Sequence, residues 1–179
     1  MKIAELIGKL DSLFTLPSVP EGEDSSPDIS GLIGQYAHGN EPSHHIIYMY
    51  SMLKEPWKTA DKVREVSKTL YSAAPDGLSG NEDVGQMSAW YILSAMGFYQ
   101  VEPGSGRYWF GSPLIDKAEI STEKGTFTIL VENNSDENRY IQSVTLNGKD
   151  CDKGYIEHKD LANGGTIILK MGPQKTLWY

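Results

Sequence analysis

The chain has 179 residues, with 16 Lys and Arg against 24 Asp and Glu, which gives a formal net charge of −8. This acidic balance argues against nucleic acids and anionic membranes as partners, because both require a basic face, and no apolar run reaches the roughly 18 to 20 residues of a membrane span. Cys151 is the single cysteine, so an intrachain disulfide is excluded.

The first part of the chain, residues 1–104, is expected to be mainly helical. Apolar residues from Ile3 to Phe14 recur at three- and four-residue steps, and this spacing predicts an amphipathic helix. The stretch 16–28 is rich in proline and acidic residues and is predicted to be an exposed loop. Its acidic part, 21–28, lacks the ligand spacing of an EF-hand calcium loop. Further helices are expected at 31–36, 43–53, 59–73 and 83–96.

The helices expected at 43–53 and 83–96 are apolar nearly all round. A helix without a polar face is normally buried among other helices, so we expect both to be covered by neighbours.

The second part of the chain, residues 105–179, is expected to be a β-strand region. Alternation of apolar residues and short apolar runs predict strands at 126–131, 144–146 and 166–171. Asn-Gly dipeptides predict turns at 147–148 and 163–164. The predicted fold class is therefore α+β, with an N-terminal α-helical part followed by a C-terminal antiparallel β-sheet region.

Two segments of mixed polar residues, His38–His45 and Gly77–Trp90, each precede a predicted helix. A helix N-terminus has unpaired N–H groups and a partial positive charge, which favour an ionised carboxylate nearby. Asp83 lies at the start of the helix predicted at 83–96, where an ionised carboxylate suits a general base. The alternative, that Asp83 and Glu41 serve only as helix caps or dipole partners, stays open.

Other candidate groups point to structural roles. His44 and His45 are adjacent and project from different helix faces, so they do not readily share a zinc ion with His38. The charged run 61–65 is typical of a solvated helix face. Cys151 lies beside a turn with no histidine partner readable from the sequence, so we interpret it as a bystander.

The polar segments, taken in order with their neighbours, resemble family 92 of the glycoside hydrolases. The resemblance covers nearly the whole chain. It is carried by Gly31–Ile46, Pro56–Thr59, Gly77–Trp90, Gly97–Tyr99, Tyr108–Pro113, Asn133–Ser135 and Tyr140–Ser143.

This resemblance implies the C-terminal portion of a calcium-dependent, inverting exo-α-mannosidase, in particular an α-1,2-mannosidase acting on terminal α-mannosides of glycans. The chain would supply the last helices of an (α/α)6 toroid and the closing β-strands. Asp83 matches the family's general base. Asn40 and Glu41 match a segment of the calcium and substrate shell, so both are candidate ligands of calcium and of substrate. The further candidate substrate-binding residues are His44, Asn81 and Glu82.

Two departures from the family pattern shape the expected activity. Asn81 stands where some members have a second aspartate, and nothing in residues 1–30 matches the glutamate motif of the family's general acid. The N-terminal β-sandwich and the upstream helices are also missing. The isolated chain is therefore expected to be inactive, with these missing parts and mannose-containing glycans as its natural partners.

Two alternatives remain. The chain could be a non-catalytic carbohydrate- or calcium-binding module, or a structural piece that needs its missing partner domain and self-associates through exposed apolar helices. The resemblance also implies that the parent enzyme is exported, to the periplasm, the cell surface or the medium.

Overall fold

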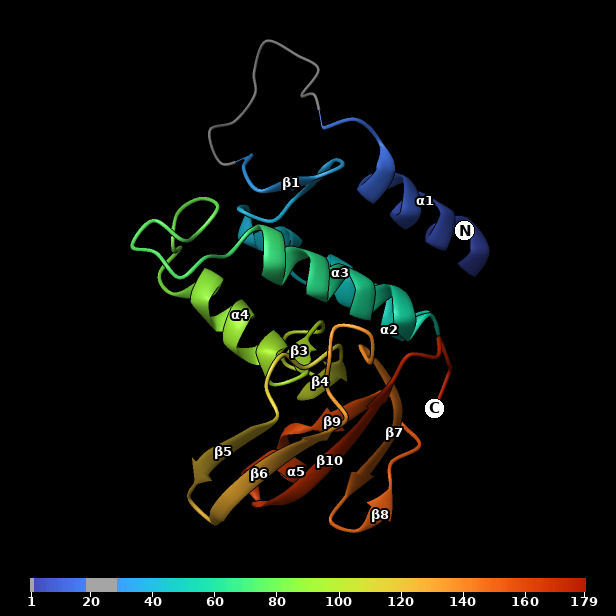
Figure 1. Cartoon of the computed structure of the whole chain (residues 1–179), viewed down its shortest axis with the longest axis vertical. Helices are drawn as coiled ribbons and strands as arrows, with labels where there is room; N and C mark the ends of the chain where they lie inside the picture. The colour runs from blue at the N-terminus through green and yellow to red at the C-terminus, as the bar shows by residue number, and fades with distance from the viewer. Residues whose placement is uncertain (1, 19–28) are drawn as a thin grey trace. The chain divides into compact units, whose positions relative to one another are not determined.

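A computed structural model describes residues 2–18 and 29–179 of the chain (Figure 1). The acidic loop predicted at 21–28 lies outside these residues. The helices are α1 Ile3–Thr15, α2 Met49–Met52, α3 Pro56–Thr69, α4 Gln86–Ala95 and α5 His158–Ala162, with the 3-10 turns η1 Glu41–Ser43 and η2 Ile46–Tyr48. The strands are β1 Leu32–Ile33, β2 Tyr36–Ala37, β3 Phe98–Gln100, β4 Arg107–Phe110, β5 Lys117–Thr122, β6 Gly125–Glu132, β7 Tyr140–Leu146, β8 Lys149–Asp150, β9 Tyr155–Glu157 and β10 Gly165–Gly172. The predicted α+β class is confirmed.

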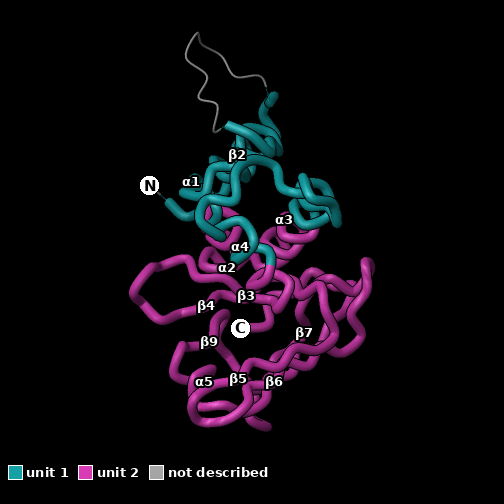
Figure 2. Tube along the Cα trace, turned by 90° about the vertical axis from the view of Figure 1, so that its left-hand side faces the viewer, with its two compact units in different colours: residues 1–44, 65–91 teal, residues 45–64, 92–179 magenta. Residues whose placement is uncertain are grey.

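The chain forms two compact units, coloured teal and magenta in Figure 2. The first unit contains residues 1–44 and 65–91, and the second contains 45–64 and 92–179. The predicted boundary near residue 104 separates mainly helical from mainly strand-forming sequence. Each compact unit, in contrast, contains two separate stretches of the chain. Helices α3 and α4 each contribute residues to both units.

The first unit begins with the predicted amphipathic helix, observed as α1. Its buried residues are Leu10 and Phe14, which lie on the apolar stripe. The turn of the next element packs closely on the end of this helix: the Gln35 N–H donates to the Leu13 carbonyl at 2.7 Å. A Cβ placed on Gly34 would lie 2.5 Å from the Phe14 backbone, so this position requires glycine.

The prediction of a short helix at 31–36 was wrong. Strands β1 and β2 form a hairpin with a two-residue turn, in which Leu32 pairs with Ala37 and Ile33 pairs with Tyr36. Gly34 in the turn has a φ of +61°. This left-handed conformation is open to glycine and unavailable in a right-handed helix, which explains why the segment pairs as strands.

The helix expected at 43–53 was also wrong in its first half. The turns η1 and η2 precede α2, and regular helix begins only at Met49. The hydroxyl of Ser43 donates to the carbonyls of Ala37 at 2.6 Å and Asn40 at 2.8 Å. Such side-chain bonds to nearby backbone compete with helical hydrogen bonds, so this stretch follows a tighter path. The helix predicted at 59–73 is observed earlier, as α3.

The second unit holds a five-stranded sheet among the described residues, in the order β5-β6-β10-β7-β8, and a three-stranded sheet in the order β3-β4-β9. Phe127, Ile129 and Ile167 are fully buried in its core, as the alternation in the sequence predicted. The sheets are mainly antiparallel, but β10 pairs with β6 in parallel. This parallel pair is an exception within the predicted antiparallel region.

The two Asn-Gly turns have different structures. Asn147 and Gly148 have φ values of +51° and +76° and join β7 to β8, as a two-residue hairpin turn requires. Asn163 and Gly164 instead close helix α5, because the Asn163 N–H donates to the Lys159 carbonyl and Gly164 has a φ of +74°. Both dipeptides reverse the chain, but the second ends a helix.

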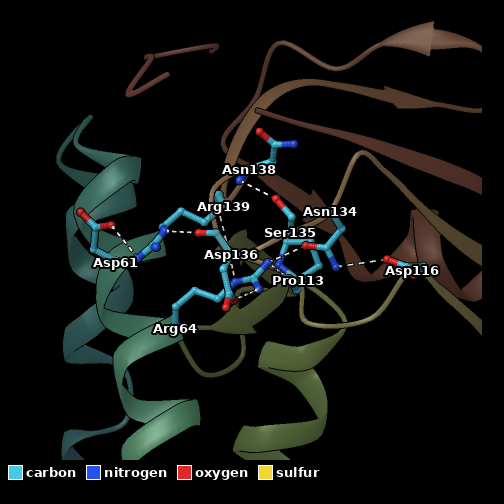
Figure 3. Close-up of polar contacts among 10 residues, drawn as sticks. Asp61, Arg64, Pro113, Asp116, Asn134, Ser135, Asp136, Asn138 and Arg139 are labelled. Atoms are coloured by element: carbon cyan, nitrogen blue, oxygen red, sulfur yellow. Dashed lines mark hydrogen bonds and ion pairs between the residues drawn. The ribbon is translucent and has the colours of Figure 1, made fainter. Parts of the chain in front are cut away.

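Helix α3 is attached to the strand loops of the second unit through Arg64 (Figure 3). Arg64 is 7% exposed, and its guanidinium donates to the Ser112 hydroxyl at 2.9 Å, the Asn134 side-chain oxygen at 2.6 Å and the Pro113 carbonyl. Asp136 lies 3.9 Å away as its ionic partner. Burial lowers the pKa of Arg64, and the carboxylate of Asp136 opposes that shift.

In the ranges that the structure describes, no helix combines the length and the apolarity needed to cross a lipid bilayer.

Candidate functional site

The two polar segments identified in the sequence, apart from His45, belong to the first unit and approach each other at their glycines. A Cβ placed on Gly39 would lie 2.2 Å from the Ser79 carbonyl oxygen, and one placed on Gly80 would lie 3.3 Å from the Gly39 Cα. The Ser30 hydroxyl donates to the same Ser79 carbonyl at 2.9 Å. Two glycines therefore allow the backbones to touch. Asn40 and Glu41 continue from one side of this contact, and the segment with Asp83 continues from the other.

A buried histidine connects the two segments. His38 is 0% exposed, and its ring nitrogens contact the hydroxyls of Tyr36, at 2.8 Å from Nδ1, and Tyr71, at 2.7 Å from Nε2. The Tyr71 hydroxyl donates its one hydrogen to the Met87 carbonyl at 3.1 Å. It must therefore accept from His38, which makes His38 Nε2 the protonated nitrogen and Nδ1 the acceptor for Tyr36.

The surroundings keep His38 neutral. Burial, with a smaller electrostatic contribution from the neighbouring His44, lowers the pKa of His38 from 6.5 to about 3. The His44 ring stacks on His38 with centroids 4.6 Å apart, and the Trp90 ring meets His38 edge-on at 4.4 Å. This packed aromatic group joins the backbone just before Asn40 to the first turn of helix α4.

His44, a predicted substrate contact, is 1% exposed. Its Nε2 donates to the His38 carbonyl at 2.9 Å, and its Nδ1 accepts from the Gln86 amide at 3.2 Å. The Trp90 indole N–H donates to the His44 carbonyl at 3.3 Å. Both ring nitrogens therefore have protein partners, and the contact of His44 with substrate stays a prediction.

Asp83, the predicted general base, precedes helix α4 by a complete turn. The helix begins at Gln86 and not at Asp83 as predicted. Asp83, Val84 and Gly85 have φ values of +50°, +56° and +90°, so the chain makes a left-handed turn before the right-handed helix. The Gly85 N–H donates to the Glu82 carbonyl, and the Gln86 N–H donates to the Asp83 carbonyl. Asp83 is half-buried on this turn.

Glu82, a further predicted substrate contact, binds the start of α4. Its two carboxylate oxygens accept from the Ser88 N–H at 2.9 Å and the Ser88 hydroxyl at 2.8 Å. The Ser88 N–H belongs to the first turn of the helix and has no helical partner, so Glu82 acts as the capping carboxylate. Asn81, next to it, is exposed.

The candidate calcium residues lie at the start of η1. Glu41 is exposed, and its carboxylate makes no hydrogen bond or ion pair with another described residue. Asn40 is half-buried, and its carbonyl accepts from the Ser43 N–H at 3.0 Å. Carboxylate and amide oxygens are the donors that calcium prefers. Across residues 2–18 and 29–179, His, Cys, Asp and Glu side chains form no group of three or more that could hold a metal ion.

The aromatic group around His38 was missed in the sequence. The segment His38–His45 was interpreted as polar residues that precede a helix, and both Tyr36 and Tyr71 lie outside the two polar segments. The sequence contains no local signal for it, because the bond from His38 to Tyr71 spans 33 positions of the chain.

Comparisons with known proteins identify the family and the fold. Residues 3–173 match the family model described as the glycosyl hydrolase family 92 catalytic domain. An uncharacterized secreted glycosidase of Arthroderma benhamiae is 31% identical over 144 residues, which are 78% of this chain and 19% of that protein.

Two solved structures from Bacteroides thetaiotaomicron have the same fold over most of the chain. A family GH92 α-mannosidase in complex with mannoimidazole is 40% identical, with a TM-score of 0.88, over 97% of this chain and 23% of that one. A family GH92 inverting mannosidase is 37% identical, with a TM-score of 0.80, over 96% of this chain and 24% of that one. The chain thus spans less than a quarter of the length of each of these relatives.

Proposed function

The chain belongs to glycosyl hydrolase family 92, and we propose that it is the C-terminal portion of an inverting, calcium-dependent α-mannosidase with Asp83 as the general base. One observation carries the proposal: the Asn40–Glu41 and Asn81–Asp83 segments extend from a single backbone contact in the first unit. Support comes from two solved relatives, of which one is called an α-mannosidase and the other an inverting mannosidase.

The reaction needs two carboxyl groups with opposite protonation. In inverting hydrolysis the groups stand about 6.5–9.5 Å apart, so that a water fits between the sugar and the base. Asp83 would take a proton from that water as the water attacks the anomeric carbon. The general acid would protonate the leaving oxygen, and no residue of this chain matches its motif, so a longer protein would supply it.

Calcium would be held in part by Asn40 and Glu41. One amide oxygen and two carboxylate oxygens fall short of the roughly six to eight ligands that calcium takes. Water, sugar hydroxyls and residues of a longer protein would complete the shell. The ion would supply charge that orients and polarises vicinal hydroxyls.

The proposed substrate is the terminal α-mannoside of a glycan, with α-1,2-linked mannose as the first linkage to test. Asn81 and the carboxylate of Glu41 are the exposed polar groups that would hydrogen-bond its hydroxyls. We further propose that the parent enzyme is exported, which is compatible with the name of the fungal relative, a secreted glycosidase.

The decisive experiment compares two proteins on α-1,2-mannobiose with and without calcium. The 179-residue chain alone should show no turnover, because it lacks the acid. A longer protein that contains this chain and the upstream family region should turn over in a calcium-dependent manner. There, Asp83→Asn should lower kcat by about 10²- to 10⁴-fold. Turnover that survives this substitution would remove Asp83 from the role of base.

The second candidate function is a non-catalytic carbohydrate- or calcium-binding module. It is favoured by the exposed Glu41 carboxylate, which has no protein partner among the described residues. Calorimetry of the chain with calcium and then with mannose separates the candidates. Binding by the chain, combined with inactivity of the longer protein, would favour the module.

A further inference from the structure

The segment that carries Asp83 has a backbone conformation that its own residues disfavour. Asp83 and Val84 have φ values of +50° and +56°, in the left-handed region. For L-residues this region brings Cβ close to the following carbonyl oxygen, and a β-branched residue such as valine is a genuine outlier there. Gly85, at +90°, is the one member of the run suited to its conformation.

Contacts of the Val84 side chain do not explain the strain. This side chain is fully exposed, with a relative exposure of 109%, so burial of its methyl groups does not offset the backbone cost. A strained conformation persists only where the surrounding structure over-determines it. The restraint on this turn must therefore come from its backbone and its neighbours.

One restraint on the turn, among the described residues, is the side chain of Glu82. It reaches across the turn from its first residue to Ser88 in the helix and uses both carboxylate oxygens, at 2.9 and 2.8 Å. Three backbone bonds complete the turn: the Gly85 and Met87 N–H groups each donate to the Glu82 carbonyl at 3.2 Å, and the Gln86 N–H donates to the Asp83 carbonyl at 3.1 Å. A side chain with both oxygens occupied in this way is a poor candidate for direct contact with substrate.

We propose that residues 82–88 form a strained, braced turn in which Glu82 and Ser88 are positioning residues that hold Asp83 in its working orientation. The inference rests on the proposed role of Asp83 as the base. It changes the role of Glu82, which the family resemblance had suggested as a substrate contact. The inference also gives Val84 a role, although its side chain is fully exposed. The left-handed backbone at Val84 is the strained part of the turn that the hydrogen bonds of Glu82 hold in place.

The first test measures the strain. Val84→Gly removes the Cβ and should raise the melting temperature of the chain by about 2–4 °C, whereas Val84→Ala, which keeps the Cβ, should raise it less. Leu16→Gly is the matched control, because Leu16 is also an exposed apolar residue but has an ordinary φ of −66°. It should not raise the melting temperature. A Val84→Gly chain that melts no higher than the wild type would overturn the claim of strain.

The second test measures the brace by amide hydrogen exchange at Gly85 and Gln86. Glu82→Ala should speed exchange at both amides by about tenfold or more, because the turn opens locally. Glu82→Gln should restore most of the protection, since its amide can still accept from the Ser88 N–H and donate to the hydroxyl. Glu123→Ala removes an exposed carboxylate elsewhere and should leave both amides unchanged. Unchanged exchange in Glu82→Ala would overturn the brace.

The third test separates positioning from simple stabilisation. In the longer protein that turns over mannobiose, Glu82→Ala should lower kcat by about tenfold with little change in KM, and Glu82→Gln should recover most of that loss. A direct contact of Glu82 with substrate would instead raise KM. A Glu82→Ala enzyme with an unchanged kcat would overturn positioning by the turn. Failure of the wild-type protein to hydrolyse mannosides would instead count against the proposed function, and the melting and exchange results would still decide on the strain and the brace.

Discussion

At the scale of single residues, the buried His38 makes stability depend on pH. Its pKa falls from 6.5 in an exposed state to about 3 in the folded chain, so between these values the unfolded state binds the extra proton. Stability is therefore complete above pH 6.5 and decreases as the pH falls below that value. Between pH 7 and pH 5 the loss should be about 2 kcal/mol. Urea denaturation at the two pH values measures it.

The variant His38→Gln isolates this effect. It keeps a donor and an acceptor but has no titrating group, so its free energy of unfolding should fall less between pH 7 and pH 5 than that of the wild type. Equal losses in the two chains would show that His38 titrates normally in the folded state.

The hydroxyl of Tyr71 is predicted to matter more than its ring. Tyr71→Phe leaves the His38 Nε2–H buried without its acceptor at 2.7 Å, and this should cost about 1–3 kcal/mol in the free energy of unfolding. Tyr91→Phe is the matched control, because the Tyr91 ring lies 4.8 Å from that of Tyr71 and its hydroxyl has no hydrogen bond among the described residues. Equal losses of stability in the two variants would contradict a stabilising hydrogen bond between His38 and the Tyr71 hydroxyl.

At the scale of elements, Arg64 holds α3 against the strand loops of the second unit (Figure 3). Its planar fork reaches three acceptors, namely Ser112, Pro113 and Asn134. Lysine carries the charge but cannot reproduce the fork. Arg64→Lys should therefore lower the free energy of unfolding by about 2–4 kcal/mol. Arg139→Lys, at an arginine that is about one-third exposed, should cost less than about 1 kcal/mol.

The elements also show which parts of the fold could be predicted from the sequence. The helix α1, the buried face of β6 and the turn at 147–148 depend on local periodicity and turn chemistry, and the structure agrees with the predictions. The hairpin of β1 and β2 was mistaken for a helix because the segment 31–36 is too short to show either helical or alternating periodicity. The parallel pairing of β6 with β10 was invisible, because strand order is decided by packing between residues far apart in the chain.

The candidate site, like the fold, could be predicted from the sequence only in part. Asp83 and Glu41 could be named because their segments match a family motif, which is a property of consecutive residues. The left-handed turn could not be foreseen, since valine is among the residues that avoid it. The bond from His38 to Tyr71 could not be foreseen either, because nothing local selects one tyrosine among ten. The sequence thus predicted the groups that could react, and the structure showed the contacts around them.

At the scale of the whole molecule, the chain is expected to self-associate. Its described residues leave several large apolar side chains exposed, with Ile3 at 65%, Ile92 at 56% and Leu177 at 48%. Exposed apolar area favours contact with another protein surface, and the chain spans only 19–24% of its relatives. Sedimentation velocity at increasing protein concentration should therefore show a rising average mass.

Helix α1 offers a sharp test of this expectation. Ile3→Lys places a charge on an exposed apolar position and should shift the onset of association to higher concentration, by about 1 kcal/mol or roughly fivefold, for the loss of part of one apolar contact. Lys9→Ser, on an exposed polar position of the same helix, should leave the onset unchanged. A chain that sediments as a monomer at all accessible concentrations would show that these side chains are too dispersed to form an interface. Association that persists equally in both variants would instead direct attention to Ile92 and Leu177 in the second unit.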